Sequence, residues 1–173
     1  MPGSVLLRLI LEMVKKILKI LAIVIVVAVI VLQFFRIDKA NPPVIKGETV
    51  EAATAVPPDI SLILGRSCND CHSNQTIYPW YSNVQPMAWF LKNHIDDGRR
   101  HLNFSVWNTY TPQKKSKKLE EICDEVESKN MPLPSYLWIH RDAVLSENEA
   151  KALCDWAKQE KGKVDAAIAA AGQ

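Results

Sequence analysis

The N-terminal part of this chain contains an apolar run, residues 17–35, that constrains the fold more than any other feature. Within it only Lys19 and Gln33 are strongly polar, and residues 20–32 are all Ile, Leu, Val or Ala. On an insertion scale, each Ile, Leu or Val favours the bilayer by roughly 0.3–0.6 kcal/mol. A helix of this length matches a hydrocarbon core of about 30 Å, so we expect one N-terminal transmembrane helix formed by residues 17–35.

Charge divides the chain in the same way. Residues 1–36 carry five basic groups and one acidic group, whereas residues 37–173 carry 16 basic and 18 acidic groups. By the positive-inside rule, the basic groups before the apolar run place the N-terminus in the cytoplasm and the remainder outside it. A cleaved signal peptide is the alternative, but Asp38 and Lys39 stand where small residues would be needed. The slightly acidic remainder argues against a nucleic-acid-binding surface.

These patterns divide the chain into four segments. We expect a cytoplasmic N-terminus and membrane anchor in residues 1–36, a linker with four prolines in residues 37–58, a folded domain in residues 59–160 and a frayed tail in residues 161–173. The folded domain has apolar residues at helical spacing and no convincing strand alternation, so we predict an all-α fold.

Three amphipathic helices stand out in the folded domain. The first follows Pro86 and ends near Gly98, with apolar residues at helical spacing. The second begins with Thr111 as its N-cap and Pro112 in its first turn. The third opens on a capping box that begins at Ser146.

Residues 68–72 read Cys-Asn-Asp-Cys-His, which is the spacing of a c-type haem attachment site. Two thiols three residues apart lie on one helical turn, where each can add to a vinyl group of the same porphyrin. The next residue, a histidine, is then held beneath the iron as an axial ligand. We therefore predict one covalently attached haem c, with Cys68 and Cys71 as thioether residues and His72 as the proximal iron ligand.

Other readings of the two thiols fit less well. A zinc site would need two further ligands, but His94 and His101 are seven residues apart, outside the usual spacing, and the other two cysteines stand alone. A thioredoxin-like dithiol is expected beside a βαβ pattern, which this chain lacks. A disulfide within the motif leaves His72 without a role.

The iron needs a sixth ligand or an open position, and five residues are candidates: Met87, His94, His101, Met131 and His140. Met131 is the best placed, because the prolines that follow it stiffen an extended segment between two helices. His94 is the second choice, since a histidine on an otherwise apolar helix face needs a polar partner.

Two further groups of residues leave alternatives open. Cys123 and Cys154 both fall on inward helix faces. They are either two buried thiols or a disulfide between the helices. The aromatic residues of the folded domain either enclose the haem or form the core. They are Tyr78, Trp80, Tyr81, Trp89, Trp107, Tyr110, Tyr136, Trp138 and Trp156.

Several stretches together resemble the small bacterial haem-binding domain family related to cytochrome c. They are residues 68–74, 78–82, 98–99, 102–105 with Trp107, 131–136, and a closing helix around Trp156, and the resemblance covers about residues 58–160. The resemblance implies a cytochrome c-like, mostly helical fold with Cys68, Cys71 and His72 in the roles given above. It points to Met131 as the distal ligand, although His94 also belongs to the family pattern.

The combined reading is a membrane-anchored, mono-haem c-type cytochrome on the periplasmic side of a bacterial inner membrane. It is an electron carrier and not an enzyme, with redox proteins as partners. Relatives fused to cytochrome c and di-haem peroxidase modules indicate other cytochromes or a di-haem peroxidase as such partners. The alternative is a haem sensor or small peroxidase, in which the sixth iron position is open or weakly held.

Overall fold

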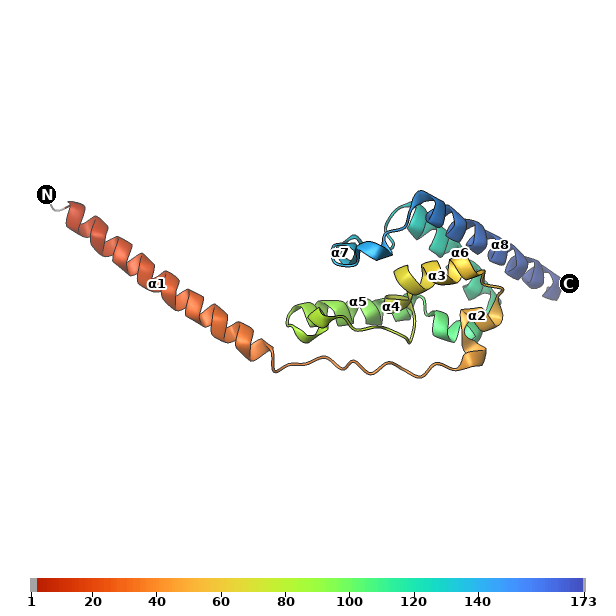
Figure 1. Ribbon diagram of the computed structural model, residues 1–173, viewed down its shortest axis with the longest axis horizontal. Helices are drawn as coiled ribbons and strands as arrows, with labels where there is room; N and C mark the ends of the chain where they lie inside the picture. The colour runs from red at the N-terminus through yellow and green to blue at the C-terminus, as the bar shows by residue number, and fades with distance from the viewer. Residues whose placement is uncertain (1–2, 173) are drawn as a thin grey trace. The chain divides into compact units, whose positions relative to one another are not determined.

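The computed structural model describes residues 3–172, with side chains from residue 7 onward, and no strand occurs among them. The all-α prediction is therefore confirmed. The chain divides into two compact units: residues up to Asp38 together with Pro79–Lys92, and Lys39–Tyr78 together with Asn93 onward. The order of helices in Figure 1 is α1 (Gly3–Leu32), η1 (Lys46–Glu48), α2 (Val50–Ala53), α3 (Pro58–Ser67), α4 (Asn69–His72), η2 (Trp80–Asn83), α5 (Met87–His101), η3 (Phe104–Thr109), α6 (Pro112–Glu127), α7 (Pro134–Leu137), η4 (Arg141–Ala143) and α8 (Glu147–Ala171).

The predicted transmembrane helix is wrong: no helix within residues 3–172 is long and apolar enough to cross a membrane. α1 ends at Leu32, and residues 33–35 form a turn instead of extending the helix. The uninterrupted apolar part is then Ile20–Leu32, which rises about 20 Å against a hydrocarbon core of about 30 Å. Any longer stretch of α1 takes in Lys19 and then Lys16 and Lys15. The predicted placement in a bacterial inner membrane, with a periplasmic domain, depended on this span. It is therefore wrong as well.

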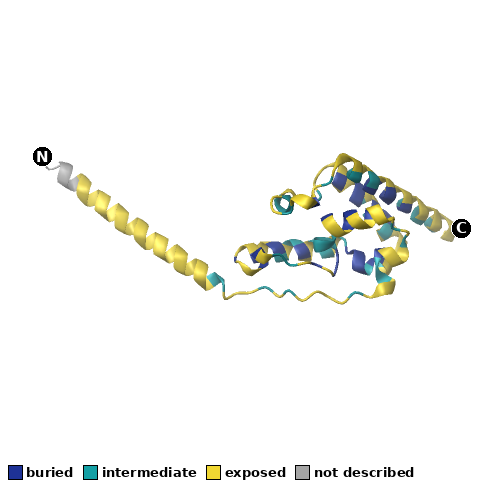
Figure 2. Cartoon of the chain, viewed as in Figure 1, coloured by how far each residue is buried: buried dark blue, intermediate teal, exposed yellow. Residues whose placement is uncertain are grey.

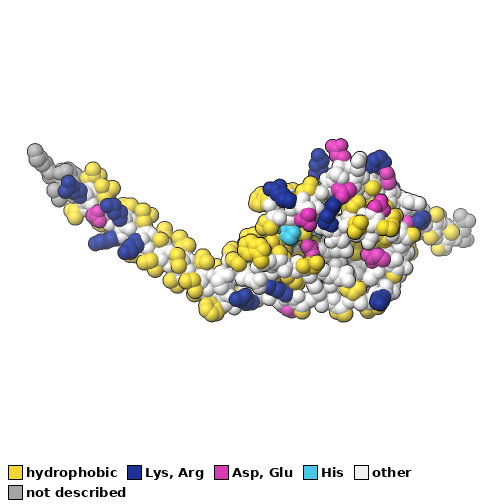
Figure 3. All heavy atoms as spheres, viewed as in Figure 1, with side chains coloured by type: hydrophobic (Ala, Val, Ile, Leu, Met, Phe, Trp, Pro, Cys, Tyr) yellow, Lys and Arg dark blue, Asp and Glu magenta, His cyan; other side chains and the backbone are white. Residues whose placement is uncertain are grey.

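α1 keeps its apolar side chains exposed along its described length (Figure 2). Hydrophobic side chains cover most of it, and lysine and arginine side chains gather toward its N-terminal part (Figure 3). After α1, the side-chain amide of Gln33 donates to the carbonyl oxygen of Gln85, and the Gln85 amide donates to the carbonyl oxygen of Phe35. These bonds join the end of α1 to residues 79–92 within the same unit.

The second unit contains the hydrophobic core. α6 and α8 lie side by side (Figure 1), and a disulfide joins Cys123 on α6 to Cys154 on α8. Of the two possibilities for these cysteines, the structure therefore has the disulfide. Buried side chains of α2, α3 and η3 belong to the same core cluster as those of α6 and α8. The core consists of Val50, Ile60, Ile63, Leu64, Phe104, Trp107, Leu119, Ile122, Val126, Leu153, Trp156 and Ala157.

The predicted helix starts are confirmed by their hydrogen bonds. The Thr111 hydroxyl accepts from the Lys114 N–H at the start of α6, and Ser146 and Glu149 form the capping box of α8. α5 does not stop near Gly98 but continues to His101. α8 is helical through Ala171, and the expected linker contains η1 and α2.

Candidate haem-binding site

A cavity of about 430 Å³ opens in the second unit, between α4, the last turns of α5, α6 and the segment that follows α6. Its apolar lining comes from aliphatic side chains and one phenylalanine: Leu64, Leu102, Phe104, Ile122, Val126, Leu133 and Leu153. Cys68, Cys71, His72, His94 and Met131 line the same cavity. A cavity of this size and polarity is typical of small-molecule and cofactor sites.

The imidazole of His72 has a defined orientation and tautomer. Its Nδ1 lies 3.1 Å from the carbonyl oxygen of Gly98 and 3.0 Å from that of Leu102. Carbonyl oxygens only accept hydrogen bonds, so Nδ1 carries the proton and Nε2 keeps its lone pair. Burial, followed by smaller contributions from the charges of His101 and Lys118, lowers the pKa of His72. A neutral histidine whose Nδ1–H is held by a backbone carbonyl is the usual state of a metal-ligating histidine.

The two thiols of the motif are not joined to each other. Burial raises the pKa of Cys68 to about 12 and that of Cys71 to about 11, so both are neutral S–H groups at pH 7. Cys68 caps α4, and the Cys71 and His72 N–H groups both donate to its carbonyl oxygen. This single turn presents both thiols and the imidazole to one cavity.

Gly98 explains how α5 comes close enough to reach His72. A Cβ atom at this position would lie 2.6 Å from the Cys71 carbonyl oxygen and 3.0 Å from the Cys71 Cβ. Real Cβ atoms do not approach other atoms so closely. Only glycine therefore allows α5 to cross the turn formed by residues 68–72 at this distance. The sequence analysis placed the end of the helix near Gly98, so it missed this packing role.

Hydrogen bonds hold the turn on its other side as well. The Arg99 guanidinium donates to the Ser73 carbonyl oxygen at 2.8 Å and to the Thr76 hydroxyl at 2.9 Å. The buried Asn74 receives a bond of 2.8 Å from the Asn103 amide. We call residues 68–76 and 98–105 the attachment wall.

Another part of the cavity lining comes from residues 129–137, which we call the distal segment. Lys129 adopts a φ of 60° and ends α6, after which the Asn130 and Met131 N–H groups both donate to the Glu125 carbonyl oxygen. The Tyr136 hydroxyl donates to a carboxylate oxygen of Asp70 at 2.8 Å. Asp70 lies between the two cysteines of the motif, so this bond joins the distal segment to the attachment wall.

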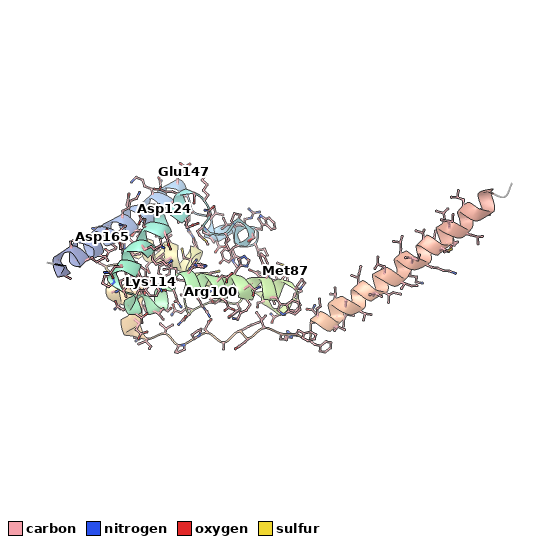
Figure 4. The ribbon with its side chains drawn as sticks, turned by 180° about the vertical axis from the view of Figure 1, so that it is seen from behind. Met87, Arg100, Lys114, Asp124, Glu147 and Asp165 are labelled. Atoms are coloured by element: carbon pink, nitrogen blue, oxygen red, sulfur yellow. A yellow bond between two sulfur atoms is a disulfide. The ribbon has the colours of Figure 1, made fainter. Side chains whose placement is uncertain are left out.

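The structure thus brings together some of the predicted site residues and not others. Cys68, Cys71, His72, Met131 and His94 share the cavity, and so does His101. Met87, labelled in Figure 4 at the start of α5, is not among the described cavity residues, nor is His140, whose ring stacks on Tyr136 at 4.1 Å.

The sequence left open whether the aromatic residues enclose the haem or form the core, and the structure answers this for several of them. Of the nine tryptophan and tyrosine residues considered, Tyr136 is the one that lines the cavity among the described residues. Trp107 and Trp156 belong to the core instead, and Trp80 and Trp138 are exposed. Aliphatic side chains from α3, α6 and α8 form much of the cavity lining instead. Lys118 also lines the cavity, although its run of charged residues resembles an ordinary solvated helix face.

The residues present fit a haem group. An apolar cavity accepts a porphyrin ring, two neutral thiols lie on one turn with an imidazole, and that imidazole directs a lone pair away from its backbone partners. An all-α fold with this site defines a haem protein. The family comparison agrees: residues 27–159 match the model of the haem-binding domain family, and the chain belongs to that family. No curated protein and no solved structure matches the chain.

Proposed function

We propose that this protein is a c-type haem protein that transfers electrons through one haem, attached at Cys68 and Cys71 and ligated by His72 and Met131. The observation that carries the proposal is the orientation of His72. Its Nδ1–H is taken up by two backbone carbonyls, so Nε2 is the ligating atom available within the cavity that the two thiols also line.

The attachment chemistry needs only the two thiols and the haem. The S–H bond of each thiol would add across one vinyl C=C bond, so that sulfur would form a C–S bond and the hydrogen would go to the neighbouring carbon. No oxidant is consumed. Both thiols are neutral and half-buried and lie on one helical turn, in the sequence spacing of a c-type attachment motif.

Bound haem supplies a one-electron iron couple, and the protein determines its potential through the axial ligands, burial and hydrogen bonds. His72 donates through Nε2, and the carbonyls of Gly98 and Leu102 increase its basicity. Met131 offers a thioether from the distal segment. Thioether ligation favours ferrous iron relative to two imidazoles, so this pair is suited to exchanging single electrons with a redox partner protein.

Covalent attachment is tested on a denaturing gel. Haem staining is expected to remain with the polypeptide of the unmutated protein and to be lost in the Cys68→Ala, Cys71→Ala double variant. Haem that leaves the unmutated polypeptide under these conditions contradicts attachment.

Ligation is tested by the far-red charge-transfer band of ferric haem, which reports sulfur coordination. The band is expected in the unmutated protein and in Met87→Ala, which alters a methionine outside the described cavity lining. It is expected to vanish in Met131→Ala, whose ferrous form then binds carbon monoxide rapidly. If the unmutated ferrous protein already binds carbon monoxide rapidly, the sixth position is open, and a haem sensor or small peroxidase replaces the electron carrier. If the band persists in Met131→Ala, Met131 is not the ligand.

A further inference from the structure

The cavity is poor in positive charge. Lys118 is the only lysine or arginine among the described residues that line it, whereas four carboxylates do so: Asp70, Asp97, Glu121 and Glu125. A haem carries two propionate carboxylates, and a carboxylate removed from water is costly unless it is paired or hydrogen-bonded. Most of the charged groups at this cavity therefore repel a propionate.

Lys118 is held inside the cavity by its position on α6, one turn after Lys114 (labelled in Figure 4). Its side chain is 14% exposed, while that of the preceding Lys117 is 72% exposed. The long stem of a lysine can cover apolar surface while its ammonium group reaches a polar partner. The neighbouring residues Leu119 and Ile122 belong to the core, so this face of α6 points inward.

Lys118 and His72 line the same cavity, together with Cys68 and Cys71. Lys118 therefore belongs to the site in which the proposed function places the haem.

We propose that Lys118 binds a propionate carboxylate of the haem, as a positioning residue for the cofactor. This inference rests on haem binding in this cavity, which the proposed function assigns to it. It does not depend on electron transfer or on the identity of the sixth ligand.

Lys118 must leave its ion pair with Glu121 to bind a propionate, and a second lysine near Glu121 makes this possible. The Lys118 Nζ lies 2.5 Å from one oxygen of Glu121, and the Lys117 Nζ lies 3.6 Å from the other. When Lys118 turns to a propionate, Glu121 keeps Lys117 as its cation. No carboxylate in this group is then left without a positive partner, and the rearrangement is confined to side chains.

The test compares haem with its dimethyl ester, which has the same ring but no propionate charge. The full-length protein, purified without haem, is titrated with each compound, and binding is followed by the haem absorption band. A charge-assisted hydrogen bond contributes about 1.5–3 kcal/mol, so Lys118→Gln is expected to weaken haem binding about tenfold or more. The affinity for the dimethyl ester is expected to stay unchanged, which also shows that the cavity of the variant is intact.

Two further variants complete the test. Lys117→Gln removes a charge from the same helix and the same carboxylate, but outside the cavity, and is expected to leave both affinities unchanged. Lys118→Arg keeps the charge and is expected to retain most of the preference for haem over the ester. Equal losses for haem and ester in Lys118→Gln, or no loss for either, overturn the proposal, as does an equal loss in Lys117→Gln. Failure of the unmutated protein to bind either compound overturns the haem site itself.

Discussion

The two sides of the cavity are built in different ways. On the attachment wall, His72 has two backbone partners, Gly98 permits a close helix crossing, and Asn74 and Asn103 are buried and bonded to each other. The distal segment has no fully buried residue in its described length, 129–137. It is held by backbone bonds at the end of α6 and by the bond from Tyr136 to Asp70.

In the proposed haem site, this difference would combine a rigid ligand, His72, with an adjustable one, Met131. Residues with many buried partners open only when much of the protein unfolds, whereas segments with few buried groups open locally at low cost. We expect the position of His72 to be insensitive to changes elsewhere and the position of Met131 to respond to them. The following four predictions test this contrast, from the largest expected effect to the smallest.

The disulfide supports the helix from which the distal segment departs. Cys123 and Cys154 are separated by 31 residues, and a link of this span is expected to stabilise the protein by about 3–4 kcal/mol. The Cys123→Ala, Cys154→Ala variant should lose this much free energy of unfolding in a denaturant titration. Hydrogen exchange under native conditions should accelerate more in residues 129–137 than in residues 98–105. An equal acceleration in both would contradict the contrast.

Replacing Gly98 tests the attachment wall directly. Gly98→Ala places a methyl group 2.6 Å from the Cys71 carbonyl oxygen, so the backbone must shift, and we expect a loss of about 1–3 kcal/mol. Gly65→Ala is the matched control, because Gly65 lies within α3 and the added carbon meets no atom within 4 Å apart from its chain neighbours and the backbone of its own helix. That change should stabilise the protein by about 0.5–1 kcal/mol, since alanine loses less backbone entropy in a helix. Similar values for the two variants in chemical denaturation would show that the close crossing is not required.

Two tyrosines allow the same change to be made on each side of the cavity. The Tyr110 hydroxyl accepts from the N–H of Asn103, so Tyr110→Phe leaves a donor of the attachment wall unpaired and should cost about 1–3 kcal/mol. Tyr136→Phe removes a half-exposed bond to Asp70 and should cost about 1 kcal/mol or less. Thermal unfolding of both variants measures the difference. A larger loss in Tyr136→Phe would reverse the ranking of the two sides.

The smallest effect is expected from Glu149, which links α8 to α3, the helix just before Cys68. Bonds from the Ser146 N–H, the Ser146 hydroxyl and Arg66 lower the pKa of Glu149 from 4.5 to about 2. A depressed folded-state pKa contributes stability above pH 4.5, and that contribution is lost as the pH falls toward 2. Because the pair lies at the surface, we expect less than about 1 kcal/mol.

Comparison of melting temperatures between pH 6 and pH 2.5 tests this prediction. Glu149→Gln should melt slightly lower than the unmutated protein at the higher pH and nearly equally at the lower pH. A difference that grows on acidification would have the wrong sign.

The features predictable from the sequence were those carried by neighbouring residues. The cysteine and histidine motif, the Thr111 cap and the Ser146 capping box each depend on side chains within five residues, and a short pattern determines their geometry. The sharing of one cavity by Met131 and His72 also followed, from the stiffness of the proline segment and the family resemblance.

The features that could not be predicted depend on distant contacts or on where a helix ends. Gly98 is required because the Cys71 carbonyl oxygen lies close to it, and Lys118 lines the cavity because its side chain is largely covered. A local sequence pattern reveals neither contact. The apolar run was read through Phe35, but α1 ends at Leu32, so composition overestimated the length of the apolar helix.

The last turn of α5 and the imidazole of His72 share one acceptor. The Gly98 carbonyl oxygen receives the Leu102 N–H at 2.9 Å and lies 3.1 Å from Nδ1 of His72. A shorter bond at Nδ1 gives the ring more imidazolate character and strengthens donation from Nε2, which favours ferric iron. If His72 ligates haem iron as proposed, movement of the helix end along its axis would change the electron density at that iron. Pressure on the end of α5 would then alter the redox equilibrium of the haem although no group entered the cavity.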